Sequence, residues 1–460
     1  MQGETLRAQD LMVMFLLAAV LVLGMSLVKP TLGIQLAVGF MILLIAFASI
    51  RAAIYLLIFS MLLSPEIAVG QIQGRGVGGR EISLRFDDFL LIVIGFIWLV
   101  KTIVYRELAL IKSTPVNRPI LYYMLACVAA TLLGVLAGRV KPMTGLFFVM
   151  KYFEYFFIFF MVVNNVSTKD QAVRLVVALL ATSFIISLYA IHQIPSGQRA
   201  TAPFEGESGE PNTLGGYLAF ILAIVIGLVL HLKSARVRTL LVVLSGFISL
   251  ALMATLSRSS YLAVMVMFLA VLLTQWQRPG VIIVLLLLPG LVAVVAPANV
   301  KQRVTETFSG RQYGGEVKIG GVAMDLSTSE RLRSWQRVFK DWTRQPLLGY
   351  GVTGYAWTDA QYVKTLGETG LAGIVTFFFM IFRLWKRARE AFLTEQDRFC
   401  KGLAHGFLLA IVVAMVHAIG ANTFIIIRIM EPFWLCAGLV MLLPTLEGKA
   451  ESDAGVQVSA

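Results

Sequence analysis

Apolar runs of membrane-spanning length recur along the chain and limit its fold more than any other feature. Each is roughly 17–22 residues long, which is the length that an α-helix needs to cross the hydrocarbon core of a bilayer. Strands of a membrane barrel would alternate apolar and polar residues, so these uninterrupted runs exclude a closed barrel. A soluble protein of 460 residues would also need more polar surface than a composition of 58% hydrophobic and 14% charged residues provides. The sequence therefore predicts an all-α fold, a polytopic transmembrane helical bundle.

The runs divide the chain into membrane-spanning and extramembrane parts. They predict about 14 spans, or about 12 if the third and the last pair are not all spans. The predicted spans lie near residues 11–29, 32–50, 52–69, 87–105, 119–138, 146–166, 171–192, 213–231, 237–255, 259–276, 280–298, 367–385, 403–421 and 424–444. We expect an N-terminal membrane bundle of about 11 helices at 1–298, a loop at 299–366 with a surface helix at 329–345, C-terminal membrane helices at 367–446 and a cytoplasmic tail at 447–460.

Lysine and arginine in the short loops predict the orientation of the bundle. With a cytoplasmic N-terminus, one set of basic loops falls together on the cytoplasmic face, at 101–118, 231–238, 277–280 and 383–398. The outer face then receives the segments 70–86, 139–145, 193–212, 256–258 and 299–366. These loops explain the net charge of +13, which therefore does not indicate nucleic-acid binding. The first apolar run follows "MQGETLRAQD" without a small-residue cleavage site, which favours a retained helix over a cleaved signal peptide.

Two arginines stand next to predicted spans on the outer face. In "TLSRSS", Arg258 occupies a short gap between two apolar runs. Its side chain can either snorkel toward lipid phosphates or bind an anionic substrate. Arg199 comes just before "TAPFEGESGEPNTLGGYL", in which the glycines and the Pro-Asn pair predict a structured turn that opens a helix.

The segment "SERLRSWQRVFKDWTRQ" predicts an amphipathic helix on the outer surface. One face carries basic residues, namely Arg333, Arg337, Lys340 and Arg344. Ser327 or Ser329 is expected to cap its start, and Pro346 to stop it. Arg331 falls instead on the apolar side, one turn before Trp335. It either stacks on the indole or faces a cavity and binds an anion.

Other polar residues suggest packing rather than chemistry. Lys151 with Glu154 and Arg428 with Glu431 are spaced i, i+3, as expected for neutralised ion pairs inside a membrane. Of the four histidines, only His192 is expected near the outer face. Neither the histidines nor the three cysteines have the spacing of a metal site, so we expect no metal and no cofactor.

The outer face therefore gathers arginines, a surface helix and carboxylates. Interfacial arginines can hold a phosphate or pyrophosphate bidentately, and a carboxylate can take a proton from a hydroxyl. A substrate with a lipid tail, a pyrophosphate and a sugar fits that combination.

Four motifs resemble, in order and spacing, the O-antigen ligase and polymerase family of bacterial envelope enzymes. They are "EPNTLGGYLAFILAI", "TLSRSSYLAVMV", "RLRSWQRVFKDWTRQPLLGYGVTGY" and "TDAQYVKTLGETGLAGIVTFF", and together they cover roughly residues 199–385. The resemblance implies a multi-pass protein of the bacterial inner (cytoplasmic) membrane with its active face in the periplasm. It implies a C-type glycosyltransferase that moves a glycan from undecaprenyl diphosphate to an acceptor hydroxyl during O-antigen or exopolysaccharide biosynthesis. The partners would be the undecaprenyl-diphosphate-linked oligosaccharide donor, a glycan or lipid acceptor, membrane lipids and a chain-length regulator.

The resemblance also implies roles for single residues. Arg258 matches the arginine of the family's Ser-Arg motif, either Arg331 or Arg333 matches the arginine of the periplasmic helix, and Arg199 lies where a further arginine often stands. Their expected role is to bind the substrate diphosphate.

One part of the family pattern is missing. Ligases carry a histidine followed by Asn, Ser or Gln, then nine residues, then Gly-x-x-Gly. At the position of that histidine this chain has Asp359, followed by alanine, although Gly370 and Gly373 are present. Asp359 would replace the histidine as the group that accepts a proton if burial raised its pKa, and Glu368 is the alternative catalytic carboxylate. The missing histidine favours a polysaccharide polymerase over a lipid A–core ligase.

A lipid-linked oligosaccharide flippase is the alternative from another functional class. Such a transporter would usually show internal repeats and broken helices near the membrane midplane. No convincing repeat is present, and the charges gather at one face rather than along a path through the bilayer. The sequence therefore favours the enzyme.

Overall fold

The computed structural model describes residues 50–63, 66–71, 81–85, 91, 112–203, 209–280, 318–319, 322–323, 326–356 and 358–458. Within them the α-helices are α3 (Ile50–Leu63), α5 (Asn117–Leu136), α6 (Pro142–Asn165), α7 (Lys169–His192), α8 (Pro211–His231), α9 (Ala235–Ala254), α10 (Arg258–Thr274), α13 (Leu326–Trp342), α14 (Gln361–Thr394), α15 (Arg398–His417) and α16 (Ile427–Val458). Two antiparallel strand pairs accompany them, β1 (Glu66–Gln71) with β2 (Glu81–Arg85) and β3 (Lys318–Ile319) with β4 (Val322–Ala323). The prediction of a polytopic helical bundle is confirmed.

Eight of the described helices are long and apolar enough to cross a membrane, and α10 is a shorter apolar helix of 17 residues. The third predicted span corresponds to α3, which has 14 residues. The spans predicted near 11–29, 32–50, 87–105 and 280–298 lie wholly or almost wholly outside the described residues, so the predicted number of spans stays a prediction.

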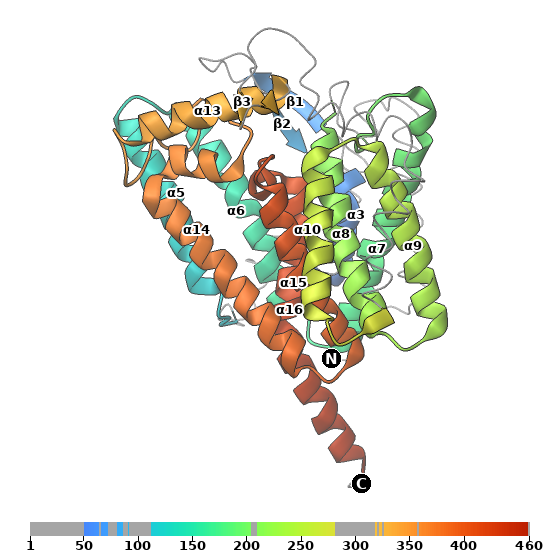
Figure 1. The fold of residues 1–460 in the computed structure, drawn as a ribbon. Helices are drawn as coiled ribbons and strands as arrows, with labels where there is room; N and C mark the ends of the chain where they lie inside the picture. Colours follow the sequence, from blue (N-terminus) through green and yellow to red (C-terminus); the bar gives the residue numbers. More distant parts are fainter. Residues whose placement is uncertain are drawn as a thin grey trace, which may run out of the picture.

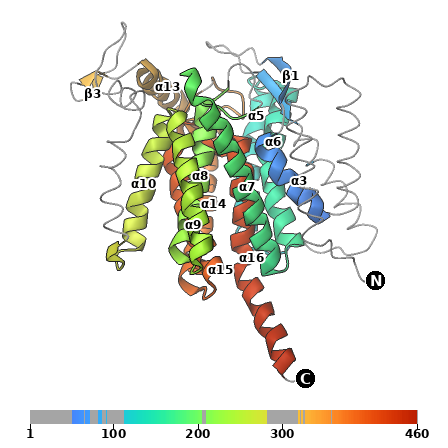
Figure 2. The same cartoon turned by 90° about the vertical axis from the view of Figure 1, so that its right-hand side faces the viewer.

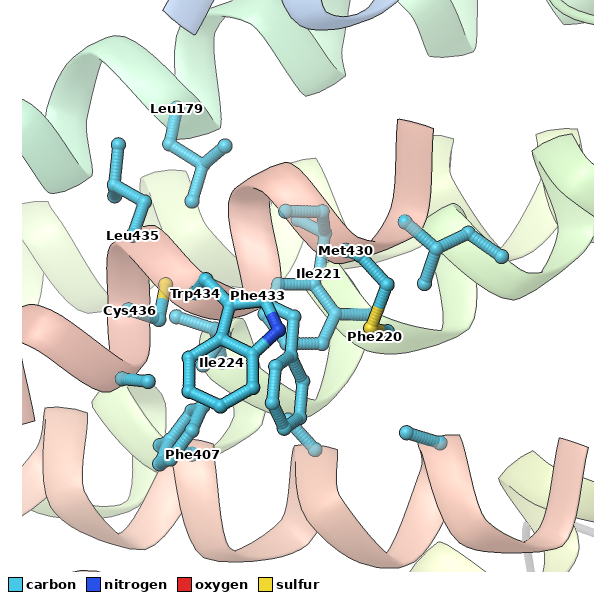
Figure 3. Close-up of a cluster of buried hydrophobic side chains, with 14 of the residues drawn as sticks. Leu179, Phe220, Ile221, Ile224, Phe407, Met430, Phe433, Trp434, Leu435 and Cys436 are labelled. Carbon is cyan, nitrogen blue, oxygen red and sulfur yellow. The ribbon is translucent and has the colours of Figure 1, made fainter. Parts of the chain in front are cut away.

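Three helices, α8, α15 and α16, form the centre of the bundle (Figure 1). In the apolar stretch of α8, α15 and α16 that is long enough to span a membrane, 83%, 78% and 89% of the residues are buried, compared with 22% for α9 at the periphery. Figure 3 shows the aromatic core where they meet, with the Phe433 ring 6.0 Å from Phe220 of α8 and 5.2 Å from Phe407 of α15. A Cβ added to Gly227 of α8 would lie 2.2 Å from the Gly406 nitrogen of α15, so glycine lets these two backbones touch.

Helix α13 lies across one end of the bundle, and the C-terminal part of α16 projects from the opposite end (Figures 1 and 2). We call the first of these ends the α13 end. The helix packs through Val338 and the half-buried Trp335 against Ala360 and Val363 of the following segment. The prediction of its bounds was partly wrong: it begins at Leu326, so Ser327 and Ser329 lie in its first turn rather than capping it, and it ends at Trp342, ahead of Pro346.

Helix α14 begins at Gln361, earlier than the predicted start at 367, and it is broken at Gly370. Gly370 has φ 63° and ψ −158°, a backbone conformation that is essentially restricted to glycine. The chain at 346–351 fills the break. Before the break, the Gly367 carbonyl accepts from Tyr350 N (3.0 Å) and the Glu368 carbonyl accepts from Gly351 N (2.8 Å). After the break, Leu371 N donates to the Pro346 carbonyl (2.9 Å) and Ala372 N donates to the Leu347 carbonyl (3.0 Å). The inserted chain thus satisfies the backbone groups that the break exposes.

Candidate functional site

Segments that are far apart in the sequence meet around a cavity of about 220 Å³ at the α13 end. They are the segment that leads into α8, helix α13, the residues before α14 and the turn after α15. The lining residues are Arg199, Gly209, Glu210, Pro211, Asn212, Arg331, Asp359, Gly420, Ala421, Asn422 and Ile426. The cavity thus brings together three residues that the sequence nominated separately, namely Arg199, Arg331 and Asp359.

Arg199 connects the cavity to the turn between α9 and α10. Its Nε donates to the Thr255 carbonyl (3.1 Å), and its Nη2 donates to the Leu256 carbonyl (3.4 Å) and to Asn212 Oδ1 (3.5 Å). Leu256 has φ 50°, in the left-handed region that side chains rarely adopt. The guanidinium therefore supports a strained turn while it lines the cavity.

A chain of side-chain hydrogen bonds fixes Asn212, which stands in the first turn of α8 after Pro211. Ser257 Oγ donates to Asn212 Oδ1 (2.9 Å), and Ser260 Oγ donates to Ser257 Oγ (2.8 Å). Ser257 is the N-cap residue of α10, and Arg258 is the first residue of that helix. Arg258 is half-buried and is not among the residues that line the cavity, although it directly follows a residue bonded to its wall.

The structure separates Arg331 from Arg333, which the family resemblance left as alternatives. Arg331 is half-buried and lines the cavity, whereas Arg333 is exposed and does not. A Cβ added to Gly420 would lie 3.9 Å from Arg331 Nη1, which shows how closely this guanidinium approaches the turn after α15. The position of Arg331 on the apolar side of α13 is therefore what turns its charge toward the cavity.

Asp359 lines the cavity but is exposed, so it lacks the burial on which its predicted role as proton acceptor depended. The backbone around it is held firmly. The Thr358 carbonyl accepts from Asn422 Nδ2 (2.8 Å), Gln361 N donates to the Ala418 carbonyl (3.1 Å), and Phe424 N donates to Gln361 Oε1 (3.0 Å). The start of α14 is thereby bonded to the turn after α15.

Glu368 lies apart from the cavity lining and is buried. Its Oε1 forms an ion pair with Lys364 Nζ (2.5 Å) and accepts from Thr353 N (3.1 Å), and its Oε2 accepts from Tyr152 of α6 (3.5 Å). These contacts join α14 to α6 and to Thr353, two residues after the chain that fills the helix break. They indicate that Glu368 stabilises the fold.

Charged residues inside the bundle also have partners. Lys151 and Glu154 form the predicted ion pair, with 3.6 Å between Nζ and Oε2. Arg428 is 2% exposed, and its Nη1 donates to the Pro203 carbonyl (3.0 Å), four residues after Arg199. This bond attaches the segment that carries Arg199 to α16.

The turn after α15 was not predicted as part of the site, although its residues Gly420, Ala421 and Asn422 form one wall of the cavity. His417 was not predicted to contribute to this turn. His417 is the last residue of α15, and its Nδ1 lies 2.8 Å from Thr423 Oγ1 in the segment that leads into α16. The only signal in the sequence is the short stretch "GANT" between two apolar runs, in which Asn422 and Thr423 are polar.

Across the described ranges, no group of three or more histidine, cysteine, aspartate or glutamate side chains has the arrangement of a metal site. The cavity offers cationic and amide groups and carboxylates, which suit an anionic, hydroxyl-bearing ligand.

Comparison with known proteins bears on the same region. No curated protein matches the chain. Residues 243–378 match the family model described as O-Antigen ligase, and this range contains Arg258, Arg331 and Asp359. Arg199 and the turn at 420–422 lie outside it. The resemblance to the O-antigen ligase family is therefore confirmed over residues 243–378 of a polytopic helical membrane protein.

Proposed function

We propose that this protein transfers a glycan from undecaprenyl diphosphate to an acceptor hydroxyl at the periplasmic face of the inner membrane, in the synthesis of a surface polysaccharide. The family match supports a glycosyltransferase-like membrane enzyme. The observation that carries the finer proposal is the cavity in which Arg199, Arg331 and Asp359 meet at the α13 end.

The proposed reaction is a displacement at the anomeric carbon of the donor sugar. The acceptor oxygen forms a bond to that carbon, the bond from carbon to the diphosphate oxygen breaks, and the lipid diphosphate leaves with the electron pair. Arg199 and Arg331 bind the diphosphate and stabilise the charge that develops on it. Asp359 is exposed, so it does not act as the buried base that the sequence suggested; as an exposed carboxylate at the cavity it accepts the acceptor's proton while the new bond forms and releases it to water.

Removal of one such arginine is expected to lower the transfer rate strongly. Removal of a single group that stabilises developing charge typically costs about 3–4 kcal/mol of transition-state stabilisation, or on the order of a hundredfold or more in rate. Arg258 belongs to the same proposal, because it adjoins Ser257 and the Asn212 network at the cavity wall.

The orientation and the domain boundaries are part of the proposal. The cavity and α13 would face the periplasm, and the basic loops at the opposite end would face the cytoplasm with the tail at 447–460. The N-terminal bundle at 1–298 and the C-terminal helices at 367–446 would then hold the periplasmic segment 299–366 between them.

The break in α14 is the one observation that favours the transporter alternative, since transporters bind substrates at broken helices. However, the chain at 346–351 fills this break, and Gly370 does not line the cavity. The enzyme therefore remains the function that the geometry supports best.

The test is reconstitution of the purified protein in vesicles with the undecaprenyl-diphosphate-linked oligosaccharide of its host. A ladder of lipid-linked repeat units indicates a polymerase, and sugar moved onto added lipid A–core or another acceptor indicates a ligase. We expect the Arg258→Ala variant to reach the membrane and form no polymer. Transport of the oligosaccharide without any transfer would contradict the proposal and support a flippase.

A further inference from the structure

Asn422 is the most buried of the polar side chains that line the cavity. It is 4% exposed and lines the cavity. Its Nδ2 donates to the Thr358 carbonyl (2.8 Å), next to Asp359, but its Oδ1 has no hydrogen-bond partner among the described residues.

The orientation of this amide follows from its one bond. A backbone carbonyl can only accept, so the group of Asn422 that faces Thr358 must be the NH₂. The oxygen therefore points elsewhere, as a fixed acceptor in a buried position. Buried amide oxygens are normally hydrogen-bonded, and one left without a donor is unfavourable.

The amide oxygen of Asn212, on another wall of the same cavity, does have hydrogen-bond donors. Its Oδ1 already accepts from Ser257 Oγ (2.9 Å) and Arg199 Nη2 (3.5 Å). At about 220 Å³ the cavity is many times larger than the roughly 10–15 Å³ that one water molecule needs. It therefore has room for a ligand group beside the arginines.

Resting on the proposed function, we propose that Asn422 Oδ1 accepts a hydrogen bond from a hydroxyl group of the substrate glycan and so forms a sugar-binding subsite beside the arginines. The missing donor is a neutral hydroxyl, because the neighbouring Arg199 and Arg331 would disfavour a cationic group. Asn422 acts as a specificity-determining residue, which selects glycans that carry a hydroxyl at one position.

The experiment is a double-mutant cycle between the protein and its substrate. The probes are mono-deoxy versions of the host's lipid-linked repeat unit, and kcat/KM for transfer is measured in reconstituted vesicles. For the wild-type protein we expect one deoxy analogue to lose about tenfold, because it leaves the buried oxygen unpaired. We expect the Asn422→Leu variant to transfer the parent glycan about tenfold more slowly than the wild type. It should have the same kcat/KM for the parent glycan and for that analogue.

Gln361→Leu is the matched control. Gln361 is buried and its Oε1 accepts from Phe424 N, so it holds the same turn from the α14 side without lining the cavity. This variant should slow the transfer of all glycans by a common factor and keep the discrimination. If Asn422→Leu does not accumulate in the membrane, Asn422→Ala takes its place in the cycle.

The subsite is overturned if each deoxy analogue loses the same factor in kcat/KM with the Asn422 variant as with the wild-type protein. The proposed function would still stand. The absence of any transfer by the wild-type protein would contradict the proposed function, and the subsite with it.

Discussion

A Gly370→Ala substitution tests whether the chain inserted into α14 is essential to the fold. At φ 63° and ψ −158°, alanine costs about 1–3 kcal/mol of backbone strain. Its Cβ would lie 2.5 Å from the carbonyl carbon and oxygen of Leu347 and 2.7 Å from Gly349 N. These are backbone atoms and cannot rotate away.

Relief of that clash would have to move the 346–349 chain. The move would break the bonds from Leu371 N to the Pro346 carbonyl and from Ala372 N to the Leu347 carbonyl. At about 0.5–1.5 kcal/mol for each bond, the two contribute about 1–3 kcal/mol. We therefore expect a total loss of about 2–6 kcal/mol in the free energy of unfolding.

The assay is thermal unfolding of the purified protein in detergent, followed by tryptophan fluorescence. Gly246→Ala in α9 is the control, because no atom lies within 4 Å of its added Cβ and alanine favours a helix. We expect a clearly lower unfolding temperature for Gly370→Ala and no decrease for Gly246→Ala. Equal unfolding temperatures for the wild type and Gly370→Ala would refute the reasoning.

Three further substitutions probe other parts of the molecule. Lys364→Met should destabilise the protein by about 3–5 kcal/mol, measured in the same unfolding assay, because it leaves the Glu368 carboxylate buried without its cation; an unchanged stability would show that the pair is not needed. Burial works to raise the pKa of Asp397, but hydrogen bonds from Lys169 and the amide of residue 400 outweigh it and hold the pKa below its usual value. This contribution to stability is present above about pH 4 and is lost as the pH falls further, so the stability of Asp397→Asn should depend less on pH in that range, and parallel pH profiles would contradict this. Asp359→Asn should lower the turnover number more than it weakens donor binding, and an unchanged turnover number would remove Asp359 from the mechanism.

The helices were predictable because a chain segment that crosses the bilayer must form its backbone hydrogen bonds within itself, as a helix does. Its apolar side chains then appear in the sequence as an uninterrupted apolar run. The inward position of Arg331 was predictable for a similar reason, since helical periodicity assigns it to the apolar face of α13. Both are properties of a single element and depend on no distant partner.

The rest of the site depends on contacts between elements that are distant in the sequence. The break at Gly370 exists because the 346–351 chain supplies hydrogen bonds on both of its sides, and periodicity carries no sign of this. The Asn422 amide is held at the cavity by its bond to the Thr358 carbonyl, 64 positions away in the sequence. Asp359 was singled out by its place in the motif and does line the cavity, but its exposure follows from how the start of α14 meets that turn.

The most direct test of the central claim compares two arginines on the same helix. Arg331 lines the cavity, and Arg333 is exposed and does not, although both carry the same charge on α13. The measurement is the initial rate of glycan transfer from lipid diphosphate in vesicles, for Arg331→Ala and Arg333→Ala. The cavity account predicts that Arg331→Ala loses about a hundredfold or more and that Arg333→Ala stays close to the wild-type rate. Equal losses in both variants, or a larger loss in Arg333→Ala, would contradict it.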